Sequence, residues 1–184
     1  SNNTAIGTQA GGQNTTGANN VAVGKDALYS NTTASGNTAL GFEAGKDIVT
    51  GTGLTATGYK AAENTTGNNN SAFGYNVMQV NTSGSQNSAF GAFALDANSS
   101  GGENSAFGYQ ALSANTTADN NTAFGYTALR YNTTGTSNTA LGDSALLANT
   151  TGNTNTAVGG RALQTNTVGD RNVAMGFQAL STLN

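Results

Sequence analysis

The chain has no cysteine, histidine, proline or tryptophan, and it has few charged side chains for its 184 residues. Without cysteine it can form neither a disulfide framework nor a thiolate metal site. Without histidine as well, the Ser-His-Asp and Cys-His catalytic arrangements and the usual zinc sites are excluded. Six basic and nine acidic residues give a net charge of -3, which is too weak to attract nucleic acid or an anionic membrane surface.

Long apolar runs are lacking too. No stretch approaches the roughly 20 apolar residues of a membrane-spanning helix, so we expect no membrane insertion by this segment. Hydrophobic residues make up 36% of the chain, and alanine is the commonest of them. The stock of Leu, Ile and Val in an ordinary globular core is therefore missing.

What the sequence does contain is a repeat. An Ala-apolar-Gly motif recurs at intervals of 17 residues, with one interval of 16, and defines eleven repeats in a single domain over residues 1–184. Each repeat is numbered here from its first residue, so that Asn121 is position 1 and Gly125 is position 5. The motif glycines are Gly7, Gly24, Gly41, Gly58, Gly74, Gly91, Gly108, Gly125, Gly142, Gly159 and Gly176.

Several positions of the repeat hardly vary. Position 3 is always Ala, position 8 is Ala except for Val77, and position 1 is Asn except for Leu54. Position 4 is apolar but free in size, apart from Thr57, and position 9 is Leu from Leu95 onward. We predict that positions 3, 4 and 9 are packing columns. Their representatives are Ala22, Ala39, Ala89, Ala106, Ala123, Ala140, Phe90, Phe107, Phe124, Leu112 and Leu129.

The charges indicate the outline of the unit. All fifteen lie at positions 6, 7, 10, 11, 16 and 17, which form three adjacent pairs. Charged side chains are almost never buried unpaired, so these pairs are predicted to be solvent-facing corners. The stretches between them show no 3.6-residue apolar stripe. We therefore predict an all-β fold in which each repeat makes a short strand, a corner and another short strand. Eleven such coils form a parallel β-solenoid about 50 Å long.

Each invariant position then has a physical reason. Position 3 faces opposite to positions 2 and 4, so one face is tight and the other carries Phe, Leu and Val. Glycine at position 5 suits a sharp bend or a positive φ. Asparagine at positions 1 and 12 is expected to stack in side-chain amide ladders and to adopt left-handed turn geometry.

Two simpler interpretations compete. A disordered low-complexity chain is one, although disorder gives no reason for excluding charge from eleven positions. The other is a monomeric solenoid whose inner space is filled by positions 4 and 9. Three solenoids packed side by side would explain the tight alanine face and the apolar face together, so we expect a homotrimer.

The repeats resemble a known family. The segments "NTALGDSAL", "NTAVGGRAL" and "NVAMGFQAL" are similar to the YadA-like head repeats of trimeric autotransporter adhesins, and to repeat arrays of bacteriophage tail fibres. The resemblance covers Asn3 to Leu180. It implies left-handed parallel β-rolls assembled as homotrimers, and an extracellular adhesive role at a bacterial surface or virion tail. The implied ligand is a glycan or protein of a host surface or matrix.

The chain also departs from that family. The family's coils are typically shorter than 17 residues, so ligand positions cannot be transferred. The fourth repeat is irregular near residues 48–64, where Ile48 and Val49 replace the usual Asn-Thr and the next spacer is one residue short. We predict a local bulge or altered groove there.

The sequence offers few side chains that could catalyse a reaction. Asp26 and Glu43 share position 7 in successive coils, about 5 Å apart, which is near the carboxylate separation of retaining glycosidases. Lys60 follows in the same column, so an exposed charge ladder is the better interpretation. The acidic residues are scattered and the calcium-binding repeat is missing. We predict no catalytic residue, no metal site and no cofactor.

Aromatic side chains gather at position 6. They are expected to stack along an outer edge, where they would either hold a sugar or a partner surface, or line a contact between subunits. These candidate contact residues are Phe42, Tyr59, Tyr75, Tyr109, Tyr126 and Phe177.

Two other functions remain open. Threonine ladders on a solenoid are typical of ice-binding proteins, although the adjacent threonines at positions 13 and 14 should point oppositely. The position-13 threonines include Thr15, Thr32, Thr82, Thr116, Thr133 and Thr150. Coils without an obvious cap could also stack end to end, which would make the chain the subunit of a self-assembling extracellular filament.

Overall fold

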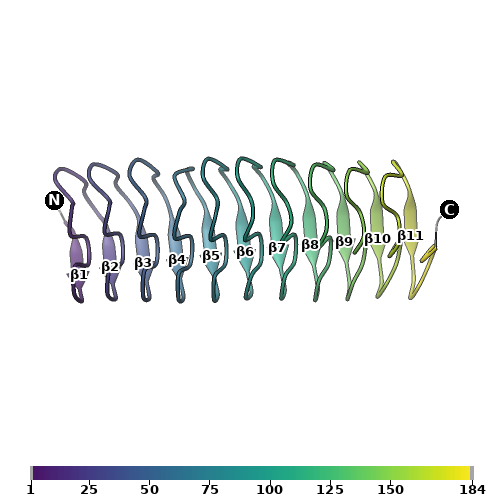
Figure 1. Ribbon diagram of the computed structural model, residues 1–184, viewed down its shortest axis with the longest axis horizontal. Coiled ribbons are helices and arrows are strands. Elements are labelled where there is room, and N and C mark those ends of the chain that lie inside the picture. The colour runs from purple at the N-terminus through teal and green to yellow at the C-terminus, as the bar shows by residue number, and fades with distance from the viewer. Residues whose placement is uncertain (1, 183–184) are drawn as a thin grey trace.

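The computed structural model describes residues 2–182 and is a straight rod made of one continuous coil (Figure 1). Each turn of the coil contributes one short strand. Eleven strands form a single parallel sheet in chain order, β1 to β11, so the predicted parallel β-solenoid is confirmed. Within the described residues, no helix is long and apolar enough to cross a bilayer.

Every strand covers positions 2 to 4 of its repeat and pairs in register with the next strand, so that Ala5 lies opposite Ala22. The strands are β1 (Thr4–Ile6), β2 (Val21–Val23), β3 (Thr38–Leu40), β4 (Thr55–Thr57), β5 (Ser71–Phe73), β6 (Ser88–Phe90), β7 (Ser105–Phe107), β8 (Thr122–Phe124), β9 (Thr139–Leu141), β10 (Thr156–Val158) and β11 (Val173–Met175). The prediction of a second strand in each coil is wrong, because the rest of each described coil consists of turns and bends. Backbone hydrogen bonds between coils nevertheless continue there, as from Thr15 N to Thr32 O at 2.9 Å.

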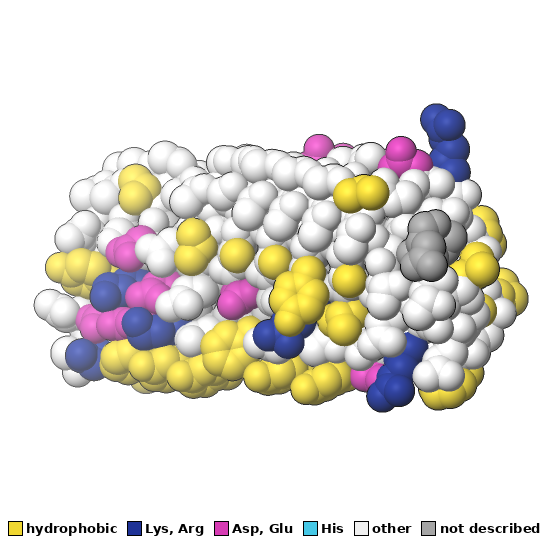
Figure 2. Space-filling view, turned by 45° about the vertical axis from the view of Figure 1, so that its right-hand side comes forward, with side chains coloured by type: hydrophobic (Ala, Val, Ile, Leu, Met, Phe, Trp, Pro, Cys, Tyr) yellow, Lys and Arg dark blue, Asp and Glu magenta, His cyan; other side chains and the backbone are white. Residues whose placement is uncertain are grey.

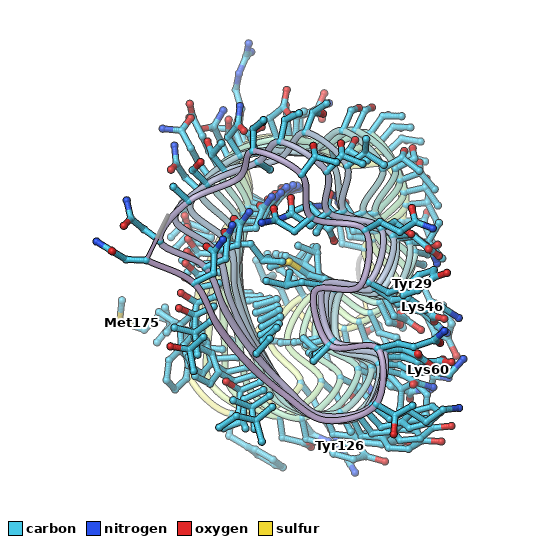
Figure 3. All side chains as sticks on the ribbon, turned by 90° about the vertical axis from the view of Figure 1, so that its left-hand side faces the viewer. Tyr29, Lys46, Lys60, Tyr126 and Met175 are labelled. Carbon is cyan, nitrogen blue, oxygen red and sulfur yellow. The ribbon has the colours of Figure 1, made fainter. Side chains whose placement is uncertain are left out.

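The apolar part of the coil's interior is thin and is filled by three columns. Position 3 points inward from the sheet and packs with positions 8 and 9 in one buried cluster, and Figure 3 shows side chains filling the inside of the coil. Ala123, Ala128 and Leu129 of one coil are each 0% exposed. The small size of the position-3 side chain is therefore set by the opposite wall of the same coil, since a larger residue would have no room.

This arrangement corrects two expectations. Position 4 does not fill the inner space, because alternation along the strand turns it outward, and Phe124 is 54% exposed. The tight alanine face does not require a second chain either, because one chain already buries Ala123 completely. A single chain leaves the column at position 4 partly uncovered.

The corners depend on positive φ angles. The position-5 glycines have φ between +120° and +145°. A Cβ on Gly91 would lie 2.6 Å from the carbonyl oxygen of Gly108, so only glycine fits this position. Positions 7, 9 and 17 are also left-handed, for example at Leu129, whose φ is 51°. The prediction that the asparagines at positions 1 and 12 adopt this geometry is therefore wrong.

The position-12 asparagines do form the predicted amide ladder. Asn115 donates from Nδ2 to Asn98 Oδ1 at 2.8 Å and to the carbonyl of Ala118 at 3.0 Å. Its own Oδ1 accepts from Asn132 at 3.1 Å. Because these side chains are 0% exposed, each must find its hydrogen-bond partners inside the rod.

The position-1 asparagines bond mainly to the backbone, and among the described residues only Asn155 and Asn172 also donate to the asparagine of the preceding coil, each at 3.1 Å. Asn121 donates from Nδ2 to the carbonyl of Gly135 at 2.9 Å, which closes its own coil. Its Oδ1 accepts from the backbone N–H of Asn138 at 2.9 Å, which joins it to the next coil. Asparagine is thus fixed at position 1 because one side chain satisfies two buried backbone groups.

The irregular repeat exchanges apolar volume between columns. Ile48 and Leu54 are buried at positions 12 and 1, where most coils have Asn. The same two coils have Gly45 and Ala62 at position 9, where most coils have Leu. A Cβ on Gly45 would lie 3.0 Å from a side-chain carbon of Leu54, which fills this space. The sheet has no bulge, because β4 stays in register with β3 and β5.

Candidate interaction surface

The outward face of the sheet carries an unbroken file of mostly apolar side chains, here called the sheet column. It is built by alternation, because the strand that turns position 3 inward turns position 4 to solvent. Exposure ranges from half-buried side chains in the middle to 61% at Ile6 and 75% at Met175. The sheet column consists of Ile6, Val23, Leu40, Thr57, Phe73, Phe90, Phe107, Phe124, Leu141, Val158 and Met175.

Four phenylalanines stack face to face in the middle of the sheet column. The ring centroids of Phe73 and Phe90 are 4.6 Å apart, those of Phe90 and Phe107 4.7 Å, and those of Phe107 and Phe124 5.1 Å. Their planes are inclined by 17° or less. The predicted packing residues thus lie on both sides of the sheet, since the alanines and leucines are inside and these phenylalanines are outside.

A second aromatic file, the tyrosine ladder, lies around the glycine corner from the sheet column, as the positions of Tyr126 and Met175 in Figure 3 show. The stacked pairs are Phe42 with Tyr59 at 5.2 Å, Tyr59 with Tyr75 at 5.1 Å, and Tyr109 with Tyr126 at 5.4 Å between ring centroids. The candidate column at position 6 thus stacks in coils 3 to 5 and again in coils 7 and 8.

One member of the ladder was missed by the sequence reasoning. Position 6 of the sixth coil is Ala92, and the ring comes instead from Phe93 at position 7. Phe93 stands edge-on, 5.5 Å from Tyr75 and 6.1 Å from Tyr109 between centroids. The available signal was that coil 6 has its aromatic residue one position later. Phe177, in contrast, shares position 6 but is separated from Tyr126 by Asp143 and Gly160.

The stacking determines which parts of the aromatic rings are accessible on the surface of the tyrosine ladder. Each stacked ring covers the face of its neighbour, so the outer surface consists mainly of ring edges and tyrosine hydroxyl groups. Sugars stack on open aromatic faces, which this geometry does not offer along its length. The edges suit packing against another apolar surface. Figure 2 shows hydrophobic side chains following the lower edge of the rod.

Charged side chains gather in coils 2 to 4 (Figure 2). Lys60 Nζ lies 3.0 Å from Glu43 and 3.2 Å from Glu63, and Lys46 Nζ lies 3.1 Å from Glu43. Burial alone would raise the pKa of Glu43, but hydrogen bonds from Lys60 and Lys46 outweigh it and lower that pKa. The hydrogen bond to Glu43, followed by that to Glu63, raises the pKa of Lys60.

Both carboxylates that were considered for catalysis form ion pairs with lysines. Asp26 pairs with Lys25 at 3.4 Å, and Glu43 is bound by two lysines. The two acids thus belong to a charge ladder, which is largely covered rather than exposed, because Asp26 is only 7% exposed. Over residues 2–182, no three acidic side chains cluster as a metal site would require.

The threonine column is also engaged. Thr116 Oγ1 donates to the carbonyl of Thr133 at 3.1 Å, and Thr133 Oγ1 donates to the carbonyl of Thr150 at 3.0 Å. The same bond to the next coil is made by Thr15, Thr82 and Thr150. These hydroxyl hydrogens therefore hold neighbouring coils together and are not free to organise an ice surface.

No family model, curated protein or solved structure matches the chain.

Proposed function

We propose that the chain is a non-enzymatic structural and adhesive module, the head or shaft of a trimeric surface adhesin or phage tail fibre. The observation that carries this proposal is the sheet column, an apolar file along the entire rod that a single chain leaves open to solvent. Its surroundings support the proposal, since position 2 of every strand is Thr, Ser or Val and the outward face of the sheet has no charge.

The mechanism is geometric. The sheet columns of three parallel rods would meet along a common axis and bury side chains such as Phe107, which stabilises the assembly through the hydrophobic effect. The charge-bearing corners at positions 6, 7, 10, 11, 16 and 17 would then face outward. A rigid array of such corners can bind a host-surface or matrix ligand, a glycan or a protein, at several points at once. This role places the protein outside the cell.

Mass in solution tests the assembly. Light scattering behind a sizing column should give three times the 18.3 kDa mass of one chain. Phe107→Asp should release smaller species, because it places a charge in the proposed interface. Tyr131→Asp makes the same kind of change on an exposed ring outside the sheet column and should leave the mass unchanged. A wild-type chain that stays monomeric at every concentration would contradict the proposal.

Adhesion is tested separately, by binding the labelled rod to glycan-coated and protein-coated surfaces. Retention that exceeds the retention of a Phe107→Asp monomer would support multivalent attachment. A trimer that is retained on neither kind of surface would leave the structural role and remove the adhesive one.

End-to-end assembly is the second candidate function. Among the described residues, β1 and β11 each pair with a single strand, so both edges present backbone groups that another coil can bond. The same scattering experiment separates the candidates, since a filament would grow with concentration beyond three chains. Ice binding is a weaker candidate because the threonine hydroxyls are engaged, and the absence of thermal hysteresis would remove it.

A further inference from the structure

The tyrosine ladder is divided into two separate pairs of phenols. Tyr59 and Tyr75 are neighbours, and so are Tyr109 and Tyr126, with ring planes inclined by 8° and 11°. Phe93 stands between the pairs. Tyr75 and Tyr109 are two coils apart, about 10 Å along the rod, which is beyond direct ring contact.

Both pairs are accessible. The four tyrosines are between 41% and 58% exposed, and they lie around the corner from the sheet column that would be buried in an assembly. The ends of the ladder hold no further phenol, because Phe42 precedes Tyr59 and Asp143 follows Tyr126 in the column. Each phenol therefore has one phenol partner in the ladder, in the adjacent coil.

We infer that Tyr59–Tyr75 and Tyr109–Tyr126 are two sites of oxidative tyrosine coupling, where a peroxidase-type one-electron oxidant joins adjacent coils by a dityrosine bond. Each phenol loses one electron and its hydroxyl proton. The two phenoxyl radicals form a carbon–carbon bond between ring carbons ortho to the oxygens, and the hydrogens on those carbons move to restore both hydroxyl groups. Each link thus releases two electrons and two protons, which reduce one hydrogen peroxide to two waters.

The fold favours this reaction within a pair. Successive coils hold the backbones of the two tyrosines about 4.8 Å apart, so the rings are always neighbours. Coupling needs the rings to swing from a stack to an edge-to-edge contact. Exposed rings make such movements rapidly compared with the reaction of a radical with a second molecule. Phe42 and Phe93 have no phenol hydroxyl and limit the reaction to the two pairs.

The remaining tyrosines provide an internal comparison. Tyr29 has Gly12 and Lys46 as its column neighbours, and Tyr131 has Ala114 and Ala148. Tyr131 is 46% exposed, similar to the paired tyrosines, and its ring lies beside the Arg130 guanidinium at 5.0 Å. Exposure alone would make Tyr131 reactive, whereas pairing should make only the ladder tyrosines form links within a chain.

The experiment treats the intact chain with a haem peroxidase and hydrogen peroxide. It measures dityrosine fluorescence in the single-chain gel band and maps linked peptides by mass spectrometry. We expect both predicted links, each with the loss of two hydrogen atoms, and a yield that does not fall on dilution. A mixture of isotope-labelled and unlabelled chains separates links within a chain from links between chains, even inside a trimer.

Conservative variants provide the controls. Tyr75→Phe and Tyr126→Phe keep the ring stack, and each should abolish one link. The double variant Tyr75→Phe/Tyr126→Phe should lose all single-chain fluorescence, whereas Tyr29→Phe/Tyr131→Phe should keep both links. Links that map to Tyr29 or Tyr131, or that form only between chains, would overturn the inference. Because the coupling needs one chain only, a monomeric mass would overturn the proposed assembly and leave this inference standing.

Discussion

The regular coils around Asn115 and the irregular coils around Ile48 build the same cross-section in two ways. In the regular coils, Leu at position 9 supplies the apolar core and Asn at position 12 supplies a buried polar ladder. In the irregular coils, Ile48 and Leu54 supply the apolar volume from positions 12 and 1, and position 9 shrinks to Gly45 or Ala62. The fold thus fixes the total volume inside a coil rather than the residue at each position.

Where the irregular coils meet the regular coils, the exchange of asparagine for apolar residues leaves buried polar atoms without hydrogen-bond partners among the described residues. Asn31 is the position-12 asparagine one coil before Ile48, and its Oδ1 accepts no hydrogen bond among the described residues because Ile48 has no donor to offer. Thr65, the position-12 residue of the next coil, likewise leaves its buried Oγ1 without a described partner. Both regions nevertheless keep glycine at position 5 and alanine at position 3. These two positions are the ones that the backbone itself dictates.

The largest expected effect is at the shared glycine. Gly91→Ala should prevent folding, because the new Cβ would meet the Gly108 carbonyl 2.6 Å away and φ is +128°. Gly58→Ala in the irregular region should be equally destructive, since its Cβ would clash with Gly74. Gly36→Ala is the control, because its Cβ would meet nothing within 4 Å, and it should cost only about 1 kcal/mol. Circular dichroism melts measure all three variants. Equal stability of the Gly91 and Gly36 variants would contradict the backbone argument.

The invariant alanine should come second. Ala123→Leu overpacks a position that is 0% exposed and should cost about 3 kcal/mol. Asp143→Ala, in an exposed corner, should change stability by less than about 0.5 kcal/mol. Denaturant unfolding measures both variants. If the two variants unfold at the same midpoint, position 3 is not the tight wall of the coil.

The polar ladder should distinguish the two regions directly. Asn115→Leu should cost about 2 kcal/mol, because Asn98 loses a donor, Asn132 loses an acceptor and the Ala118 carbonyl is left unpaired. The reverse exchange, Ile48→Asn, should cost less, about 1 kcal/mol, because the lost apolar burial is partly offset by a new donor for Asn31. Thermal melts compare them. An Ile48→Asn variant that is the more damaged of the two would show that apolar volume outweighs the ladder.

The outline of the fold could be predicted from the sequence because its constraints leave a residue signature. Invariant Ala and Gly mark close backbone approaches, and charges confined to corners mark the solvent side. Which wall the alanine faces could not be predicted, since a tight contact within a coil and one between chains leave the same signature. The structure resolves this, because position-3 alanines such as Ala123 are completely buried within a single chain.

The left-handed corners left no such signature. Positions 7 and 9 have positive φ yet are occupied by residues as different as Asp26, Lys60 and Leu129. Repeated hydrogen bonds between coils impose this geometry, for example from Leu129 N to Ala145 O at 3.0 Å. The tyrosine column at position 6 was visible in the sequence. The contribution of Phe93 was hidden because that ring enters the stack from the neighbouring position.

The smallest expected effect concerns pH, and it should have opposite signs in the two regions. In the regular coils, burial raises the pKa of Asp96 from 3.8 to about 6, against the opposing effects of its own backbone N–H and of Arg130. The folded chain therefore holds this proton more tightly than the unfolded chain. The contribution of protonated Asp96 to folding stability is fully present below about pH 4 and is lost as pH rises to about 6. Asp96→Asn should remove this loss and stabilise the chain at pH 7 by less than about 1 kcal/mol.

In the irregular region, the change of folding stability with pH has the opposite sign. Burial alone would raise the pKa of Glu43, but hydrogen bonding to Lys60 and Lys46 lowers this pKa below 4.5. The contribution of ionised Glu43 to folding stability is therefore present above that pH. It is lost as pH falls through the folded-state pKa, and Glu43→Gln should remove this loss. Thermal melts of both variants between pH 3 and pH 7 measure the two slopes. If Asp96→Asn and Glu43→Gln changed the pH profile in the same direction, the charge network would not distinguish the two regions.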